Sequence, residues 1–319
     1  MKHLNKGNFI GTEPLARSLV KDLAANGFTV KAVDGAETDQ IADTATKFVL
    51  FAGTDVDTQV ADQPWAMIIE ASNTARFLSI NILPQLQVTP EWTAAKRDAN
   101  KEVGRLNVAG QTDKNFASMD EWGMEATADL SVFPLTYDLV LTDHGIAFSM
   151  HAEGFDNTGR AHSWFVCQRG VTEGETAVGE KSPLFCVFSN AGGQVGDPDK
   201  LVANSVLRYT VIEKDILAAT APISAVVPSP DGFPIINPMQ QVMLGEGNVA
   251  IVLFPQIINT HRYVYFTTLD MLGYTSADVI SASSEVDLKP GAKLTTYRGM
   301  NANGADNRGM RVLFPVKEV

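Results

Sequence analysis

From about residue 125 onward, the chain is a succession of short apolar segments separated by turn-forming residues, and this pattern constrains its fold more than any other feature. The segments are rich in β-branched and aromatic residues, which favour strands, and they are too short for a helical bundle. Strands are expected at residues 131–140, 145–153, 161–169, 184–189, 205–213, 249–254, 262–268, 293–297 and 310–316. A series of this kind predicts an antiparallel β-sandwich-like region at residues 125–319.

Residues 1–124 have a mixed pattern and predict a small α/β N-terminal region. Short strands are expected at residues 28–33, 48–51 and 66–70. A second helix, apolar along one face, is expected to begin at Thr89. The fold class expected for the whole chain is therefore α+β, mainly β.

The first helix has clear signals at both ends. Leu15, Leu19 and Leu23 recur at the spacing of one helical face. Thr12 precedes them and is of a residue type that caps helix N-termini, so we expect its side chain to cap this helix. The Asn-Gly pair that ends at Gly27 supplies the left-handed residue with which many helices end.

A proline-rich segment at residues 221–241 is expected to be an extended strap. Proline disfavours both the interior of a helix and a central strand. The segment is nevertheless too apolar for a solvated linker, so we expect it to lie in a groove of this subunit or of a neighbour. Phe233, Ile235 and Ile236 are its expected anchor residues and a candidate subunit contact.

A hairpin between residues 148 and 167 is expected to gather polar side chains on one face. The sequence Asp-Asn-Thr-Gly at residues 156–159 is a strong turn signal. Centring the hairpin there pairs His151 with Trp164 and Glu153 with His162. Side chains alternate across a strand, so these four residues share the outer face. The expected core face carries Phe148, Met150, Ala152, Phe165 and Cys167.

Two histidines and a carboxylate on adjacent strands resemble half of a metal site. The sequence indicates no fourth ligand, and a cross-strand contact between glutamate and histidine is ordinary on a sheet. We therefore expect this face to be an exposed polar surface or a subunit contact. No metal and no other cofactor is expected.

Residues 249–254 and 262–268 predict strands that are apolar on both faces. In the first of them, Val249, Ile251 and Leu253 lie on one face, and the residues between them are also apolar. Strands of this kind are covered on both faces. The second cover is either another layer of the same chain or another subunit, and the sequence leaves both open.

The charge and the hydropathy of the chain exclude two classes of partner. The formal net charge is -12, and the basic residues are scattered. Because binding to a phosphate backbone needs concentrated positive charge, no nucleic-acid partner is expected. No apolar run has the length of a membrane span or the form of a signal peptide. We therefore expect no membrane partner and synthesis in the cytosol.

Cys167 and Cys186 are the only cysteines, so the sequence predicts no disulfide framework. They can pair only if the fold places them close together. For a chain made in the cytosol, buried reduced thiols are the expected state.

The motifs of common enzyme classes are missing from the sequence, which contains no GxxxxGK[ST], GxSxG, HExxH or CxxC. Asp143 and His144, with Ser149 or Ser163, have the composition of a hydrolase triad, but such sets arise by chance in most chains. The chain is therefore expected to work by binding and assembly, not as an enzyme.

The segments AHSWFVCQRGV, SPLFCVFSNAGG, LRYTVIEKDI and TTYRGMNANGADNRGMRVLFPV resemble structural proteins of long-tailed bacteriophage particles. The likeness is one of texture and covers roughly residues 130–319. It implies a multi-copy subunit of the tail, baseplate or neck of a virion, assembled in the host cytoplasm. The implied partners are further copies of the chain and other virion structural proteins. The alternative is a carbohydrate-binding or carbohydrate-cleaving β-sandwich module, for which Trp164 beside Glu153 is the candidate site.

Overall fold

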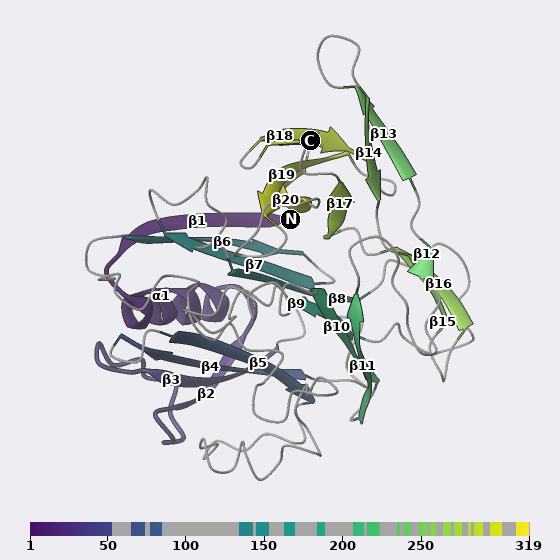
Figure 1. The fold of residues 1–319 in the computed structure, drawn as a ribbon. Helices are drawn as coiled ribbons and strands as arrows, with labels where there is room; N and C mark the ends of the chain where they lie inside the picture. The colour runs from purple at the N-terminus through teal and green to yellow at the C-terminus, as the bar shows by residue number, and fades with distance from the viewer. Residues whose placement is uncertain are drawn as a thin grey trace, which may run out of the picture.

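The computed structural model describes residues 1–52, 65–73, 77–84, 134–142, 145–152, 163–169, 184–188, 207–213, 216–223, 235–236, 239–243, 249–253, 256–259, 264–268, 271–275, 280–281, 284–289, 294–301 and 311–318. Within these residues it has one helix, α1, and twenty strands, β1 to β20. All the strands belong to antiparallel sheets (Figure 1). The structure thus confirms an α+β fold that is mainly β.

Two sheets enclose α1 (Thr12–Ala24), as Figure 1 shows. The four-stranded sheet has the order β2 (Thr29–Val33), β3 (Lys47–Phe51), β4 (Trp65–Ser72) and β5 (Phe77–Pro84). The seven-stranded sheet has the order β1 (Lys2–Phe9), β6 (Leu135–Leu141), β7 (Gly145–Ala152), β8 (Ser163–Arg169), β9 (Leu184–Phe188), β10 (Leu207–Glu213) and β11 (Ile216–Ile223). We call these two sheets and the helix the layered body.

The core of the layered body forms around α1. Of the residues in this helix only Lys21 is exposed, as expected for a helix covered by a sheet on either side. The seven-stranded sheet contributes Tyr137, Phe148 and Phe165, and the four-stranded sheet contributes Phe48, each at most 1% exposed. Burying a large apolar side chain contributes roughly 1.5–3 kcal/mol, so this cluster is the main source of stability in the layered body.

Two further sheets lie beside the layered body. The six-stranded sheet has the order β13 (Met239–Met243), β14 (Val249–Leu253), β17 (Gly273–Thr275), β20 (Arg311–Glu318), β19 (Thr295–Asn301) and β18 (Glu285–Leu288). The three-stranded sheet has the order β12 (Ile235–Ile236), β15 (Gln256–Asn259) and β16 (Val264–Thr268). In Figure 1, β13 and β14 extend away from the layered body at the upper right.

The expected end of α1 is confirmed, but the expected cap at its start is wrong. Gly27 has a φ of 100°, and the backbone N–H of Phe28 donates to the carbonyl of Leu23 at 3.1 Å. At the N-terminus the capping position is Gly11, with no side-chain cap, and the hydroxyl of Thr12 is buried without a hydrogen-bond partner.

The cap of α1 comes instead from Asn73, the residue that follows β4. The side-chain oxygen of Asn73 accepts a hydrogen bond from the backbone N–H of Glu13 at 3.1 Å. In return the backbone N–H of Asn73 donates to the carboxylate of Glu13 at 2.9 Å. Gly11 has a φ of 88°, and a Cβ there would overlap the Asn73 amide, so this approach requires glycine.

The expected hairpin register is also wrong, whereas the expected core face is confirmed for the residues that the structure describes. Ser149, not His151, lies opposite Trp164, a shift of two residues. Phe148, Met150, Phe165 and Cys167 lie in the core as expected. A shift of two residues keeps every side chain on its face, so alternation alone cannot choose between the two registers. The observed one places Phe148 directly opposite Phe165, with ring centroids 5.5 Å apart.

The expected strap at residues 221–241 is partly built into sheets. Its first residues complete β11, the edge strand of the seven-stranded sheet, where Pro222 is tolerated because only one side of the strand is paired. Ile235 and Ile236 form β12, and Met239 begins β13. Phe233 and the second helix expected from Thr89 lie outside the described residues.

Two single substitutions test the cap of α1. Asn73→Ala is expected to lower the free energy of unfolding by about 1 kcal/mol, because it removes the acceptor for the Glu13 N–H. Thr12→Val is expected to be neutral or slightly stabilising, because it removes a buried hydroxyl that has no partner. Urea unfolding measures both, and a larger loss for Thr12→Val than for Asn73→Ala would contradict this account.

Candidate functional site: the Asp138 junction

The polar face of β6 lies where the layered body meets the six-stranded sheet. Leu135, Tyr137 and Leu139 belong to the core around α1, so the alternate residue Asp138 is on the opposite face. Asn5 of β1 is the register partner of Asp138, and His3 is two positions further along the same face. Local alternation on two strands therefore brings three polar side chains together.

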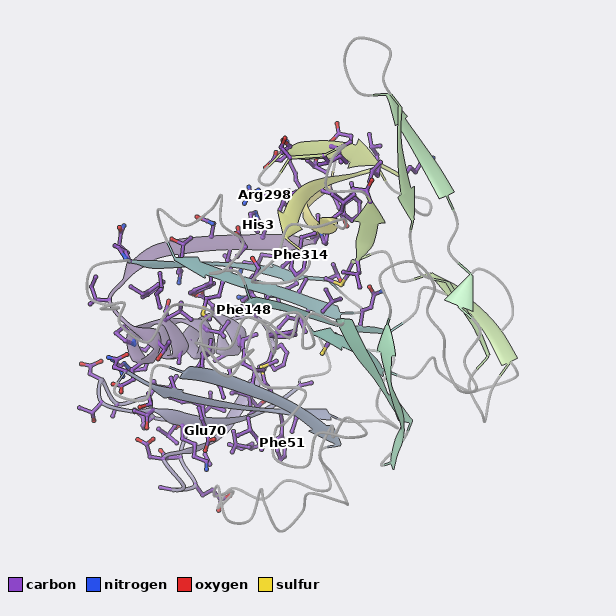
Figure 2. All side chains as sticks on the ribbon, viewed as in Figure 1. His3, Phe51, Glu70, Phe148, Arg298 and Phe314 are labelled. Carbon is purple, nitrogen blue, oxygen red and sulfur yellow. The ribbon has the colours of Figure 1, made fainter. Side chains whose placement is uncertain are left out.

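Arg298 of β19 completes this group, which we call the Asp138 junction: His3, Asn5, Asp138, Glu285 and Arg298. Figure 2 shows His3 and Arg298 near each other, between the seven-stranded and the six-stranded sheets. The junction therefore joins strands from the two ends of the chain through a residue near its middle.

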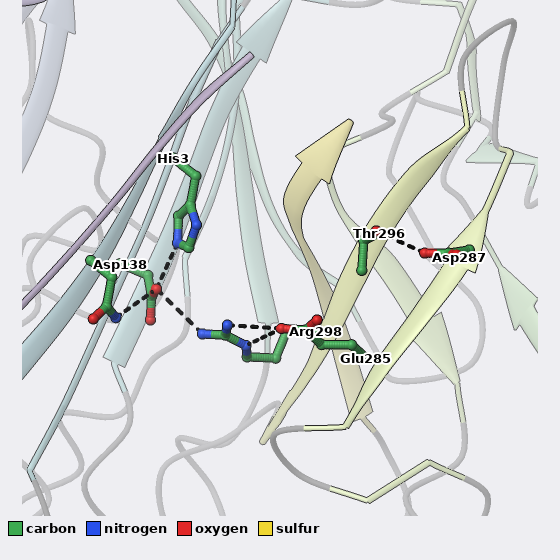
Figure 3. Close-up of polar contacts among 7 residues, drawn as sticks. His3, Asp138, Glu285, Asp287, Thr296 and Arg298 are labelled. Carbon is green, nitrogen blue, oxygen red and sulfur yellow. Dashed lines mark hydrogen bonds and ion pairs between the residues drawn. The ribbon is translucent and has the colours of Figure 1, made fainter. Parts of the chain in front are cut away.

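One carboxylate oxygen of Asp138 receives three donors (Figure 3). His3 Nε2 lies 2.7 Å from it and Asn5 Nδ2 lies 2.9 Å from it. Arg298 Nη1 lies 3.4 Å from the same oxygen. Because an ionised carboxylate only accepts hydrogen bonds, each of these groups acts as a donor. The side chain of Asp138 is 8% exposed, so the pairs are formed largely out of water.

Arg298 also binds Glu285 on the neighbouring strand β18. Its Nη2 and Nε lie 2.9 and 3.2 Å from the same oxygen of Glu285. Asp287, two residues along β18, accepts a hydrogen bond from the Thr296 hydroxyl at 2.7 Å. The guanidinium thus links a buried carboxylate of one sheet to an exposed carboxylate of another, a geometry that suits its several fixed donors.

Burial and hydrogen bonding shift the pKa of Asp138 in opposite directions. Burial by itself raises the pKa of the carboxyl group, because it disfavours the charged form. The hydrogen bonds from His3 and Asn5, together with the charge of Arg298, outweigh this effect and hold the pKa of Asp138 below its ordinary value. The group is therefore an anion at neutral pH and an electrostatic anchor for its neighbours.

A second contact near the junction joins the same two sheets. Gln168 of β8 is fully buried, and its side-chain oxygen accepts a hydrogen bond from the backbone N–H of Met271 at 2.9 Å, just before β17. Gly145 is the register partner of Gln168, and a Cβ there would lie 2.6 Å from the Gln168 Cβ. The absence of a side chain at Gly145 therefore makes room for Gln168.

Ser149 lies opposite Asp138 on β7 and is 1% exposed. Its hydroxyl has no hydrogen-bond partner in the structure. The histidine nitrogen that a triad would aim at a serine, His3 Nε2, is instead hydrogen-bonded to Asp138. The described contacts therefore form an electrostatic link between sheets, and they do not assemble a nucleophile with a base.

A second polar group lies on the other face of β6, inside the core. The Tyr137 hydroxyl donates to a carboxylate oxygen of Asp22 at 2.6 Å and lies 2.9 Å from the Ser18 hydroxyl. Lys6 Nζ lies 2.5 Å from the other oxygen of Asp22. Burial, and then the hydrogen bond to Asp22, raise the pKa of Tyr137 well above its ordinary value. The tyrosine therefore stays neutral and ties α1 to β6.

The residues predicted from the sequence as a contact surface are placed only in part. His151 of β7 is the register partner of Thr136 of β6, and Trp164 of β8 is the register partner of Ser149 of β7. Both backbone positions are therefore on the face that carries Asp138. Glu153, His162 and Phe233 lie outside the described residues. Ile235 pairs with Ile257, and Ile236 pairs with Gln256, at the edge of the three-stranded sheet.

Sequence reasoning missed the junction because its members are isolated along the chain. His3 and Asn5 lie in a polar segment that was not expected to be a strand. Asp138 does carry a local signal, since it is the one charged residue of the mostly apolar segment LTYDLVL. A buried carboxylate requires donors, but the sequence does not say which residues provide them.

In the ranges that the structure describes, no group of three or more His, Cys, Asp or Glu side chains is placed to hold a metal ion. The one described helix is too short to cross a bilayer. The sequence matches no protein-family model, and no curated protein shows significant similarity to it.

Acid titration tests the role of Asp138. The variant Asp138→Asn is expected to lower the free energy of unfolding by about 1–3 kcal/mol near neutral pH, because hydrogen bonds to a charged group are lost. The pKa of Asp138 is lower in the folded than in the unfolded chain. Its contribution is therefore complete above the unfolded value of 3.8 and is lost as the pH falls through the folded value.

The difference in urea-unfolding free energy between wild type and Asp138→Asn is thus expected to shrink as the pH is lowered to about 3. Asp43→Asn, at an exposed position, is the matched control and should show little difference at any pH. A difference for Asp138→Asn that stays constant over this range would show that the carboxylate is not an anchor.

Alkaline titration tests the buried tyrosine. The pKa of Tyr137 is raised in the fold, so its contribution is complete below the unfolded value of 10.0 and is lost as the pH rises above it. Tyr137→Phe is expected to cost about 1–3 kcal/mol at neutral pH, because Asp22 loses a donor. The variant should also lose stability less steeply than the wild type above pH 10.0. Equal slopes in urea unfolding at alkaline pH would contradict a neutral, buried hydroxyl.

Proposed function

We propose that this chain is a non-catalytic structural subunit of a virus particle, a multi-copy component of the tail, baseplate or neck of a bacteriophage. The observation that carries the proposal is the ribbon formed by β13 and β14, which we call the β13–β14 ribbon. In this proposal the partners of the chain are further copies of itself and other structural proteins of the particle. The chain acts in the virion.

Among the described residues, the ribbon is paired to the rest of its sheet at one position. β14 pairs with β13 along its whole length, from Val249 opposite Met243 to Leu253 opposite Met239. In the described residues it pairs with β17 only through Leu253 and Tyr274. A two-stranded ribbon is marginally stable by itself in water, so a ribbon of this kind gains stability from a further surface.

The sequence of the ribbon favours a protein surface as that partner. β14 reads VAIVL, and alternation in a strand assigns apolar residues to both of its faces. Contact with another subunit supplies apolar cover, at roughly 25 cal/mol for each Å² removed from water. Addition of strands or ribbons to a neighbour is a common mode of assembly for sheets with open edges.

The Asp138 junction supports the same proposal, because a projecting assembly element needs a firm base. Arg298 holds β18 and β19 to Asp138 of the layered body, and Gln168 holds the segment before β17. Both contacts act on the sheet to which the ribbon belongs. The polar side chains of the junction therefore serve to fix the orientation of that sheet.

Charged substitutions in the ribbon test the proposal. Ile251→Lys and Val252→Lys place a charge on opposite faces of β14. Each is expected to reduce self-association of the purified chain, measured by light scattering, or its incorporation into particles, measured by mass spectrometry of purified virions. The circular dichroism spectrum and the urea midpoint should stay near those of the wild type.

Ser281→Lys adds the same charge at an exposed position and is the matched control. Normal assembly of both ribbon variants would refute the ribbon as the contact. Unfolding of both variants, with Ser281→Lys stable, would show that the ribbon is packed within its own subunit. Absence of the chain from purified particles would refute the structural role as a whole.

A further inference from the structure

The only two cysteines of the chain are directly opposed on neighbouring strands. Cys167 on β8 is the register partner of Cys186 on β9. The ladder continues without a bulge on either side, as in the adjoining pair Val166 and Val187. The two strands are separated in the sequence by residues 170–183, so the pairing of β8 with β9 is what brings the two cysteines together.

Opposed positions of this kind have the separation that a disulfide requires. Directly opposite residues in an antiparallel pair have Cα atoms about 4.5–5.5 Å apart. Disulfides span Cα separations of about 4.4–6.8 Å. Opposite residues also share a face, so both positions lie on the face of the sheet that is turned toward α1, where Cys167 is fully buried.

We propose that Cys167 and Cys186 form a redox-active pair that closes to a cross-strand disulfide by exchange with a low-molecular-weight disulfide. This inference is independent of the proposed assembly role, since it rests only on the register of β8 and β9. It assigns a covalent modification to the central part of the seven-stranded sheet.

The exchange takes place in two steps. The thiolate of one cysteine attacks a sulfur of the small disulfide, which forms a mixed disulfide and releases the first small thiolate. The second cysteine loses its proton to solvent and attacks the protein sulfur of the mixed disulfide, which releases the second small thiolate. Two electrons pass from the cysteine pair to the small disulfide, which ends as two thiols carrying the two protons.

The burial of Cys167 determines when the exchange occurs. A small disulfide cannot reach a thiol inside the core, so the first step requires that β8 and β9 open locally or that folding is still incomplete. Once formed, the bond links the ends of the segment between the two strands and restricts the unfolded chain. The closed pair therefore makes the seven-stranded sheet harder to open.

The test equilibrates the full chain with mixtures of oxidised and reduced glutathione, in buffer and in urea. Acid-quenched samples are analysed by intact mass and by peptide mapping. The expected native product has lost two hydrogens, contains a peptide linking Cys167 to Cys186, and remains monomeric on a non-reducing gel. The preference for the disulfide should be about 100-fold greater for the native than for the unfolded chain, as for other bonds that close rings of this size.

A second sample is oxidised in urea, where the small disulfide reaches both thiols, and is then refolded. Its urea midpoint should exceed that of reduced chain. Cys186→Ser is the matched control and should give only a mixed disulfide with glutathione or a linked dimer. A lower midpoint for the oxidised chain, or a native product that carries two glutathione adducts, overturns the proposal.

Discussion

The structure depends first on the burial of α1 between two sheets. Each sheet has an apolar face that would otherwise meet water, and the helix carries Leu15, Leu19 and Leu23 into the space between them. Seven of the thirteen residues of the helix are buried, and of the others only Lys21 is exposed. Burial on this scale provides the free energy that offsets ordering the chain. It also requires that the few polar groups within it find partners, as Tyr137 does with Asp22 and Ser18.

The orientation of the six-stranded sheet depends on a different kind of interaction. Asp138 faces away from the apolar core, and its carboxylate accepts hydrogen bonds from His3 and Asn5 and forms an ion pair with Arg298. Removing a carboxylate from water is costly unless donors replace the lost hydration. Such a group therefore tolerates few arrangements of its neighbours. The junction selects one placement of β18 and β19 against β6, whereas apolar contact alone is compatible with several.

A buried base, and a ribbon with one described pairing to the rest of its sheet, suit the proposed assembly role. The layered body supplies a stable unit, and the Asp138 junction passes that stability to β17–β20. Among the described residues, β14 pairs with β17 only through Leu253 and Tyr274, and in the proposed role the ribbon adapts to a neighbouring subunit. In the proposed virion role, the layered body is the stable part of the subunit and the β13–β14 ribbon makes the contact with a neighbour.

The sequence by itself determined the mainly β class, the core faces of β7 and β8, the apolar face of α1 and the left-handed residue Gly27. These features follow from periodicity and from the backbone freedom of glycine, which are properties of neighbouring residues. Only the tertiary structure decided the cap from Asn73, the register of β7 with β8, the opposition of the cysteines and the partners of Asp138. The cap, the cysteine pair and the partners of Asp138 join residues that are distant in sequence. The two registers of β7 with β8 differ by a shift of two residues, which leaves the alternation of side chains unchanged. A local pattern specifies which face of a strand is buried, but which chain segment lies against that face is settled by packing of the whole.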